Sequence, residues 1–214
     1  MPPLQLSPIV RATLLLASAG SLAVVILLVV IGGASTPGYR HTSQFISELG
    51  ATGAPVEGWI RLGGFFPAGS LLLLFCTVAF RTLPRSRPLS FGLLGLAVYA
   101  AGYLVASFFP CDPGCRPAEP STSQWIHNVG GLAGYVLAPA FLLALAFAVR
   151  RWPGASGLAA AGYVAATAAL LGLLTLSPDS DVVGLSQRLL EASVLSWVLL
   201  LGLYCSRCGS ARAA

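Results

Sequence analysis

The residues of this chain that could do chemistry gather in the polar interruptions between its apolar segments. The longest interruption, Ser107 to Gly131, contains His127, the only asparagine (Asn128), Asp112 and two closely spaced cysteines. A second interruption carries Ser47 and other polar groups. Imidazole, carboxylate and hydroxyl groups at one site are typical of metal binding and of acid–base chemistry. The sequence therefore places a candidate site on this side of the molecule.

One interpretation is a hydrated metal site. Zinc and similar ions accept imidazole and carboxylate ligands, and His41, Glu48, Asp112 and His127 are the candidates. The spacing differs from H-E-x-x-H, and the chain has no third histidine. A metal is thus an open alternative that the pattern does not favour, and the cofactor is undetermined.

Another interpretation is acyl transfer, with His127 as base, Asp112 as orienting group and Ser47 as nucleophile. No sequence feature places Ser47 on a strained turn. The same residues also suit a purely structural role as helix caps and loop ties.

Polar residues also begin the last apolar segment. Gln187 and Glu191 are four residues apart and Arg188 and Glu191 three apart, which predicts a shared helical face. Ionised groups inside a membrane span are costly unless they turn inward and pair, so they are functional candidates. The predicted pocket consists of eight residues: Ser47, Glu48, Asp112, His127, Asn128, Gln187, Arg188 and Glu191.

The cysteines Cys111 and Cys115 flank Pro113-Gly114, which favours a tight turn. On an oxidising side of a membrane, a disulfide closing this small loop is the expected state. A metal pair is the alternative, but no second cysteine or histidine couple lies nearby in the sequence to complete four ligands.

Composition assigns the chain to the membrane. Of 214 residues 56% are hydrophobic and only 9% charged, with a mean hydropathy of +0.83, whereas soluble domains carry roughly a quarter charged residues. The apolar runs are continuous, so a barrel with alternating strands is excluded. We predict an all-α bundle in a single transmembrane domain over 1–214, with spans at about 10–33, 59–80, 90–109, 125–149, 158–176 and 185–204.

Within the first long loop, Ser43 to Gly50 predicts a short amphipathic helix on the outer face. Phe45, Ile46 and Leu49 fall on one side, and Gly50 is a natural stop. Such a helix is expected at the membrane interface, with its polar side toward the bundle mouth or water.

The charged residues sort by sign across the expected membrane. All seven acids lie in or beside three alternate loops, whereas most arginines lie on the opposite side: Arg11, Arg81, Arg85, Arg87, Arg150, Arg151, Arg207 and Arg212. The positive-inside rule places both termini in the cytoplasm. The arginines are scattered, so no nucleic-acid partner is expected. The absence of lysine favours a GC-rich bacterial genome, hence a bacterial plasma membrane.

Three motifs together carry a family resemblance: SQFISELGA, FPCDPGC followed by a histidine, and GLSQRLLE. Over nearly its whole length the chain resembles the six-span bacterial membrane proteins grouped as domain of unknown function 998. More distantly, its layout is similar to the eukaryotic family of GPI-anchor remodelling and autophagy-modulating proteins. The resemblance implies six helices, points to Glu48, Asp112, His127 and Arg188, and implies no reaction.

The leading functional hypothesis is a polar pocket that binds a lipid or an isoprenoid-like amphiphile. Arg188 would pair with an anionic head group or with Glu48 or Asp112, and His127 would hydrogen-bond the ligand. The alternatives are a membrane-embedded, metal-assisted hydrolase or transferase acting on a lipid, and a transporter or transport accessory. The sequence does not determine the oligomeric state.

Overall fold

A computed structural model describes residues 4–209. In that range the regular secondary structure is entirely helical, and loops connect the helices. The spans are α1 (Pro8–Ala34), η2 (Trp59–Phe65) continued by α2 (Phe66–Thr82), α3 (Arg87–Phe108), α4 (Thr122–Val149), α5 (Ser156–Leu174) and α6 (Val183–Arg207). The six are long and apolar enough to cross a bilayer. The predicted fold class is confirmed, and the chain is an integral membrane protein.

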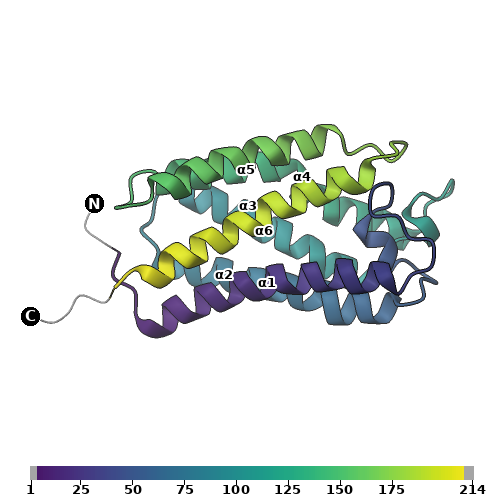
Figure 1. The fold of residues 1–214 in the computed structure, drawn as a ribbon, viewed down its shortest axis with the longest axis horizontal. Helices are drawn as coiled ribbons and strands as arrows, with labels where there is room; N and C mark the ends of the chain where they lie inside the picture. Colours follow the sequence, from purple (N-terminus) through teal and green to yellow (C-terminus); the bar gives the residue numbers. More distant parts are fainter. Residues whose placement is uncertain (1–3, 210–214) are drawn as a thin grey trace, which may run out of the picture.

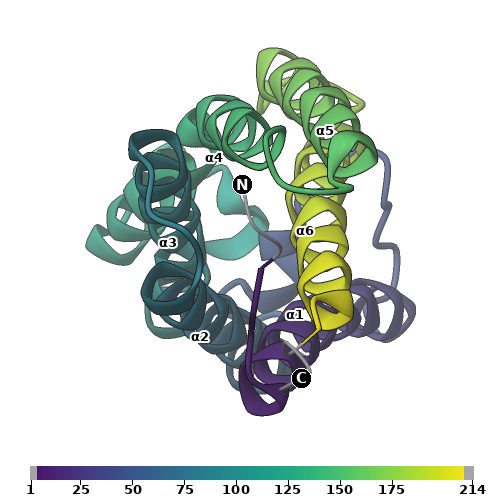
Figure 2. The ribbon, with the colours of Figure 1, turned by 90° about the vertical axis from the view of Figure 1, so that its left-hand side faces the viewer.

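The six helices form a closed ring (Figure 2). Each packs against its neighbours in the chain, and α6 closes the ring on α1. By contrast, α4 and α6 both pack closely on α5 and only slightly on each other. Large side chains such as Phe75, Phe141 and Trp197 are fully buried inside the ring. The ring is therefore solid over much of its length.

The contact between α3 and α4 is unusually close because glycines face it. A Cβ atom at Gly102 would lie 2.9 Å from the carbonyl oxygen of Gly130, and one at Gly134 would lie 2.7 Å from Cα of Tyr99. Small residues at such positions allow membrane helices to approach backbone to backbone. This approach brings the tyrosines of the two helices together.

Long loops gather at one end of the bundle, which we call the loop-rich end (Figure 1). It carries segments 35–58, 109–121 and 175–182, with the short helices η1 (Ile46–Gly50) and η3 (Pro113–Cys115). Leu4 and Gly209 line one groove at the opposite end, so both ends of the described chain lie there. Arg212, which contributed to the charge pattern, lies outside the described residues.

The short outer helix is present, but its placement corrects the expectation. It is a 3₁₀ helix covering only Ile46–Gly50, and Ile46 and Leu49 are buried against the bundle. Its apolar side chains face the protein and not the membrane interface, because the six-helix ring offers them a core to pack on.

Candidate functional site

The centre of the site is the carboxylate of Glu191, which α6 holds inside the ring with 5% of its surface exposed. Tyr99 and Tyr103 of α3 donate hydrogen bonds to its Oε2, and Tyr135 of α4 donates to its Oε1 at 2.6 Å. Tyr99 and Tyr103 are four residues apart, so they project from one face of α3. Three phenol groups from two helices thus converge on one carboxylate.

A hydrogen-bond chain connects this carboxylate to the loop-rich end. Gln187, one turn before Glu191 on α6, donates from Nε2 to the Tyr135 hydroxyl at 2.8 Å. Its Oε1 accepts from the backbone N–H of Ile46 at 2.6 Å. Gln187 therefore joins η1 to the buried tyrosines.

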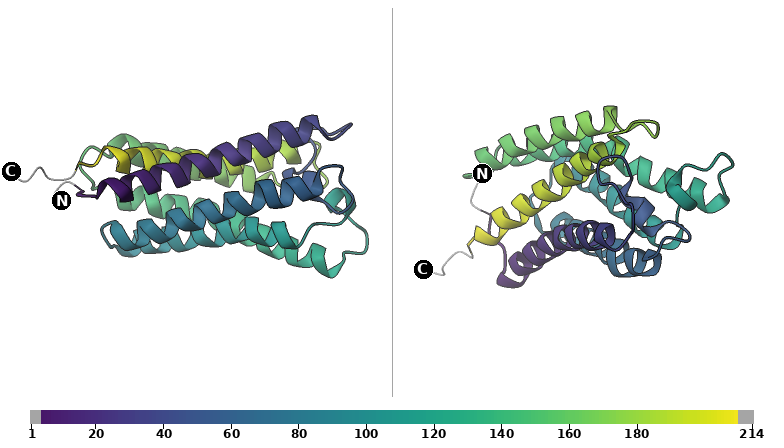
Figure 3. Two further views of the ribbon diagram at one scale, coloured as in Figure 1. Left: turned by 90° about the horizontal axis from the view of Figure 1, so that it is seen from below. Right: turned by 45° about the vertical axis from the view of Figure 1, so that its right-hand side comes forward.

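A cavity of about 290 Å³ lies above these groups. Glu191 and the three tyrosines form part of its wall, and Phe45, Phe65 and Leu176 contribute apolar surface. Its rim includes Asn128, Leu132 and Pro178, which are exposed. The right-hand view of Figure 3 shows the start of α4 lying apart from the start of α6. Among the described residues, no arginine lines the cavity.

Phe65, the last residue of the π-helical segment η2, lines the cavity. A π-helical turn holds an extra residue and is common at functional sites. In the same segment, Nε of Arg61 donates to the carbonyl oxygen of Ser107 at 2.9 Å. That bond ties the start of the second span to the end of α3.

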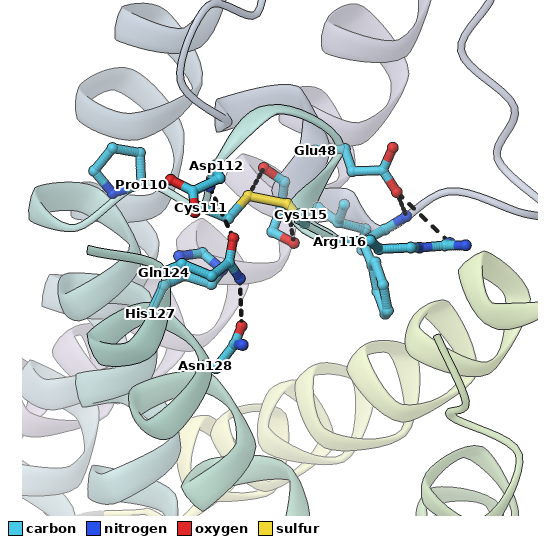
Figure 4. Close-up of a disulfide and its surroundings, with 12 residues drawn as sticks. Glu48, Pro110, Cys111, Asp112, Cys115, Arg116, Gln124, His127 and Asn128 are labelled. Carbon is cyan, nitrogen blue, oxygen red and sulfur yellow. Dashed lines mark hydrogen bonds and ion pairs between the residues drawn. A yellow bond between two sulfur atoms is a disulfide. The ribbon is translucent and has the colours of Figure 1, made fainter. Parts of the chain in front are cut away.

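His127 and Asn128 also line the cavity, and one polar side-chain atom of each is held by a neighbour (Figure 4). Nδ1 of His127 lies 2.9 Å from the carbonyl oxygen of Phe109. Oδ1 of Asn128 accepts from Nε2 of Gln124 at 2.7 Å, and Oε1 of that glutamine accepts from the backbone N–H of Asp112 at 2.8 Å. α4 thus positions the loop before it.

Glu48 and Asp112 hold loops in place and do not line the cavity. Glu48 accepts from the backbone N–H of Phe45 and from Nε2 of Gln44, each at 2.8 Å. Asp112 accepts from the backbone N–H and the hydroxyl of Ser121, at 2.9 and 2.7 Å. These two hydrogen bonds lower the pKa of Asp112 below its usual range.

Arg188 binds the first loop, and it contacts neither Glu48 nor Asp112, contrary to expectation. Nη1 donates to the carbonyl oxygens of Gln44 and Gly184 at 3.1 and 2.9 Å. Nη2 donates to the Tyr39 hydroxyl at 2.7 Å and lies 3.0 Å from Nδ1 of His41. Burial and the adjacent positive guanidinium lower the pKa of His41.

Arg188 and Glu191 lie three residues apart on neighbouring positions of α6, but their functional groups take different partners. Glu191 faces α3 and α4, whereas the guanidinium of Arg188 reaches the loop beside α6. An interval of three residues leaves two side chains about 60° apart around a helix. At this point on α6 that rotation is enough to separate the interior of the ring from its outer loops.

The predicted disulfide between Cys111 and Cys115 is confirmed, with Cα atoms 5.0 Å apart (Figure 4). Gly114 lies between them with a φ of 74°, a left-handed conformation that favours glycine. Sγ of Cys115 lines the cavity and lies 3.5 Å from Oγ of Ser47. The disulfide loop therefore packs on the η1 segment at the cavity mouth.

The structure does not assemble the candidate metal ligands or the acyl-transfer group. His41, Glu48, Asp112 and His127 each bond to a different partner. Across residues 4–209, no three histidine, cysteine, aspartate or glutamate side chains are grouped as a metal site. Ser47 contacts the disulfide instead of the imidazole.

Of the eight predicted pocket residues, five line the cavity: Ser47, His127, Asn128, Gln187 and Glu191. Sequence reasoning missed Tyr99, Tyr103 and Tyr135. A signal was present, because Tyr99 and Tyr103 have helical spacing within an apolar span, and buried tyrosine hydroxyls require polar partners.

Searches of curated proteins and of solved structures found no match to this chain. A family model described as protein of unknown function (DUF998) matches residues 17–204, which include all six helices in whole or in part. The chain therefore belongs to the DUF998 family of proteins of unknown function.

Proposed function

We propose that this protein binds a membrane amphiphile in the cavity between α3, α4 and α6. The observation that carries the proposal is the cavity's division into a polar floor around Glu191 and an apolar wall that includes Leu132 and Leu176. A head group fits the floor and a hydrocarbon chain fits the wall. Ligand sites are typically apolar clefts with a few converging polar groups.

The proposal includes an orientation. The chain is a single transmembrane domain of a bacterial plasma membrane, with both termini in the cytoplasm and the loop-rich end outside. The distribution of arginines supports this orientation, as does the disulfide at the loop-rich end, because disulfides persist in oxidising compartments. A C-terminal green fluorescent protein fusion is expected to fluoresce. An active alkaline phosphatase fusion at the same position would contradict the orientation.

Amphiphile binding is tested by filling the cavity. Gly131 lines it and has no atom within 4 Å of the position its Cβ would take, so the Cβ of Gly131→Leu enters open space and the side chain adds bulk there. Gly58 has equally open surroundings outside the cavity, which makes Gly58→Leu the matched control.

Each protein is purified in a mild detergent, and its retained lipids are quantified by mass spectrometry against the bulk membrane extract. We expect an enriched amphiphile with the wild type and with Gly58→Leu, and at least a fivefold reduction with Gly131→Leu. Wild-type lipid that matches the bulk extract would overturn the proposal.

A further inference from the structure

Within residues 4–209, no basic side chain contacts the carboxyl group at the floor of the cavity. Glu191 is buried, and its three partners are neutral phenol hydroxyls. Within residues 4–209 the single ion pair joins Arg116 to Glu48 at 3.9 Å, on the loops. No arginine therefore lies within ion-pair distance of Glu191.

Arg188, the basic residue nearest to Glu191 along α6, is occupied elsewhere. Both of its terminal nitrogens bond to Tyr39, His41 and two backbone carbonyls of the loop-rich end. Turning it inward would break all four contacts. A cation entering the cavity would therefore meet a carboxyl group that no arginine among residues 4–209 contacts.

The hydrogen bonds at Glu191 fit an ionised carboxylate. An ionised carboxylate only accepts hydrogen bonds, whereas a protonated one must also donate. Here three tyrosine hydroxyl groups lie within hydrogen-bond distance of the two carboxylate oxygens, an arrangement in which an ionised carboxylate accepts from all three. Hydroxyl donors spread the charge but leave its sign unchanged, and a buried charge without a counter-charge is costly.

The surrounding rings suit an organic cation. The rings of Tyr99 and Tyr103 meet edge to face, with centroids 5.7 Å apart, and the rings of Phe65 and Tyr135 lie 6.1 Å from one or the other. All four residues line the cavity. Aromatic faces beside a carboxylate attract ammonium groups through the ring quadrupole.

The same wall disfavours an anionic head group. Phosphate and sulfate are usually held by arginine, lysine or clustered backbone N–H groups. The chain has no lysine, and no arginine lines the cavity. A phosphate beside Glu191 would place two negative charges together in a poorly hydrated space.

We infer that the amphiphile bound in this cavity carries an ammonium head group, which pairs with the Glu191 carboxylate among the tyrosine rings while its alkyl chain lies along Leu132 and Leu176. This inference rests on the proposed function and narrows its ligand to one chemical class, the long-chain amines and quaternary ammonium compounds.

The test compares head groups on one chain length. Protein in dodecyl maltoside is titrated with dodecyltrimethylammonium and, separately, with dodecyl phosphate, and binding is followed by isothermal titration calorimetry against protein-free micelles. We expect saturable binding of the cation at least tenfold tighter than that of the anion. Glu191→Gln should weaken cation binding at least tenfold, while Glu119→Gln, at an exposed loop carboxylate, should not change it.

The possible results distinguish a failure of the ammonium assignment from a failure of amphiphile binding itself. Equal affinity for the two probes, or tighter binding of the phosphate, overturns the ammonium assignment and leaves amphiphile binding standing. Unchanged cation binding by Glu191→Gln overturns it as well. Binding of neither probe, together with no enriched lipid on the purified protein, overturns both. The wild-type comparison decides the question even when Glu191→Gln does not fold.

Discussion

Removing the hydroxyl group of Tyr135 is expected to destabilise the fold measurably. Tyr135→Phe deletes one hydrogen bond donated to Glu191 at 2.6 Å and one accepted from Gln187 at 2.8 Å. A hydrogen bond to a charged group contributes roughly 1.5–3 kcal/mol in soluble proteins, whereas hydrogen bonds between membrane helices average about 0.6 kcal/mol. We therefore expect a loss of about 2 kcal/mol, roughly a 30-fold drop in the folded-to-unfolded ratio.

Unfolding by sodium dodecyl sulfate in mixed micelles, followed by circular dichroism, measures this loss. Tyr163→Phe is the matched control, because Tyr163 lies on α5 with 37% of its surface exposed, and such substitutions change stability by less than about 0.5 kcal/mol. A double-mutant cycle with Glu191→Gln should give a coupling energy above roughly 0.5 kcal/mol. If Tyr135→Phe and Tyr163→Phe lower the free energy of unfolding equally, the role of the Tyr135 hydroxyl is refuted.

Three further perturbations test the loop ties. Replacing Cys111 and Cys115 by serine should cost about 2 kcal/mol through the entropy of the closed loop; unfolding curves that coincide with and without reductant would contradict this. Because the folded state lowers the pKa of His41, this residue contributes stability that is present above pH ~6.5 and is lost as the pH falls below it. His41→Gln should therefore weaken the dependence of the unfolding free energy on pH between about pH 7 and 5. Arg188→Lys should raise amide exchange in the segment 39–44 at least tenfold; unchanged exchange would show that the guanidinium does not hold this loop.

The six helices could be predicted because their signal is local. Each apolar run is long enough to cross a bilayer, and the polar interruptions separate the runs clearly. The disulfide followed from two cysteines around a turn. Neither prediction depends on how distant parts of the chain pack.

The partners of the charged residues could not be predicted in this way. Arg188 meets Tyr39 and His41 because the first loop folds back over α6, at a separation of almost 150 residues. Glu191 meets its tyrosines because glycines let α3 and α4 approach closely. Both depend on tertiary packing, which hydropathy and charge patterns do not encode.

The polar residues of the loop-rich end divide into two groups with different tasks. Glu48, Asp112 and Arg188 form hydrogen bonds with loop backbone groups and neighbouring side chains. These bonds hold the loops around the cavity in place. Glu191, which Gln187 links to the loops through Tyr135, is the buried carboxyl group that faces the cavity. Because Gln187 also holds the N–H of Ile46, a ligand that displaced Tyr135 or Glu191 would disturb the loop above it. The floor of the cavity and its mouth are therefore physically connected through Gln187 of α6.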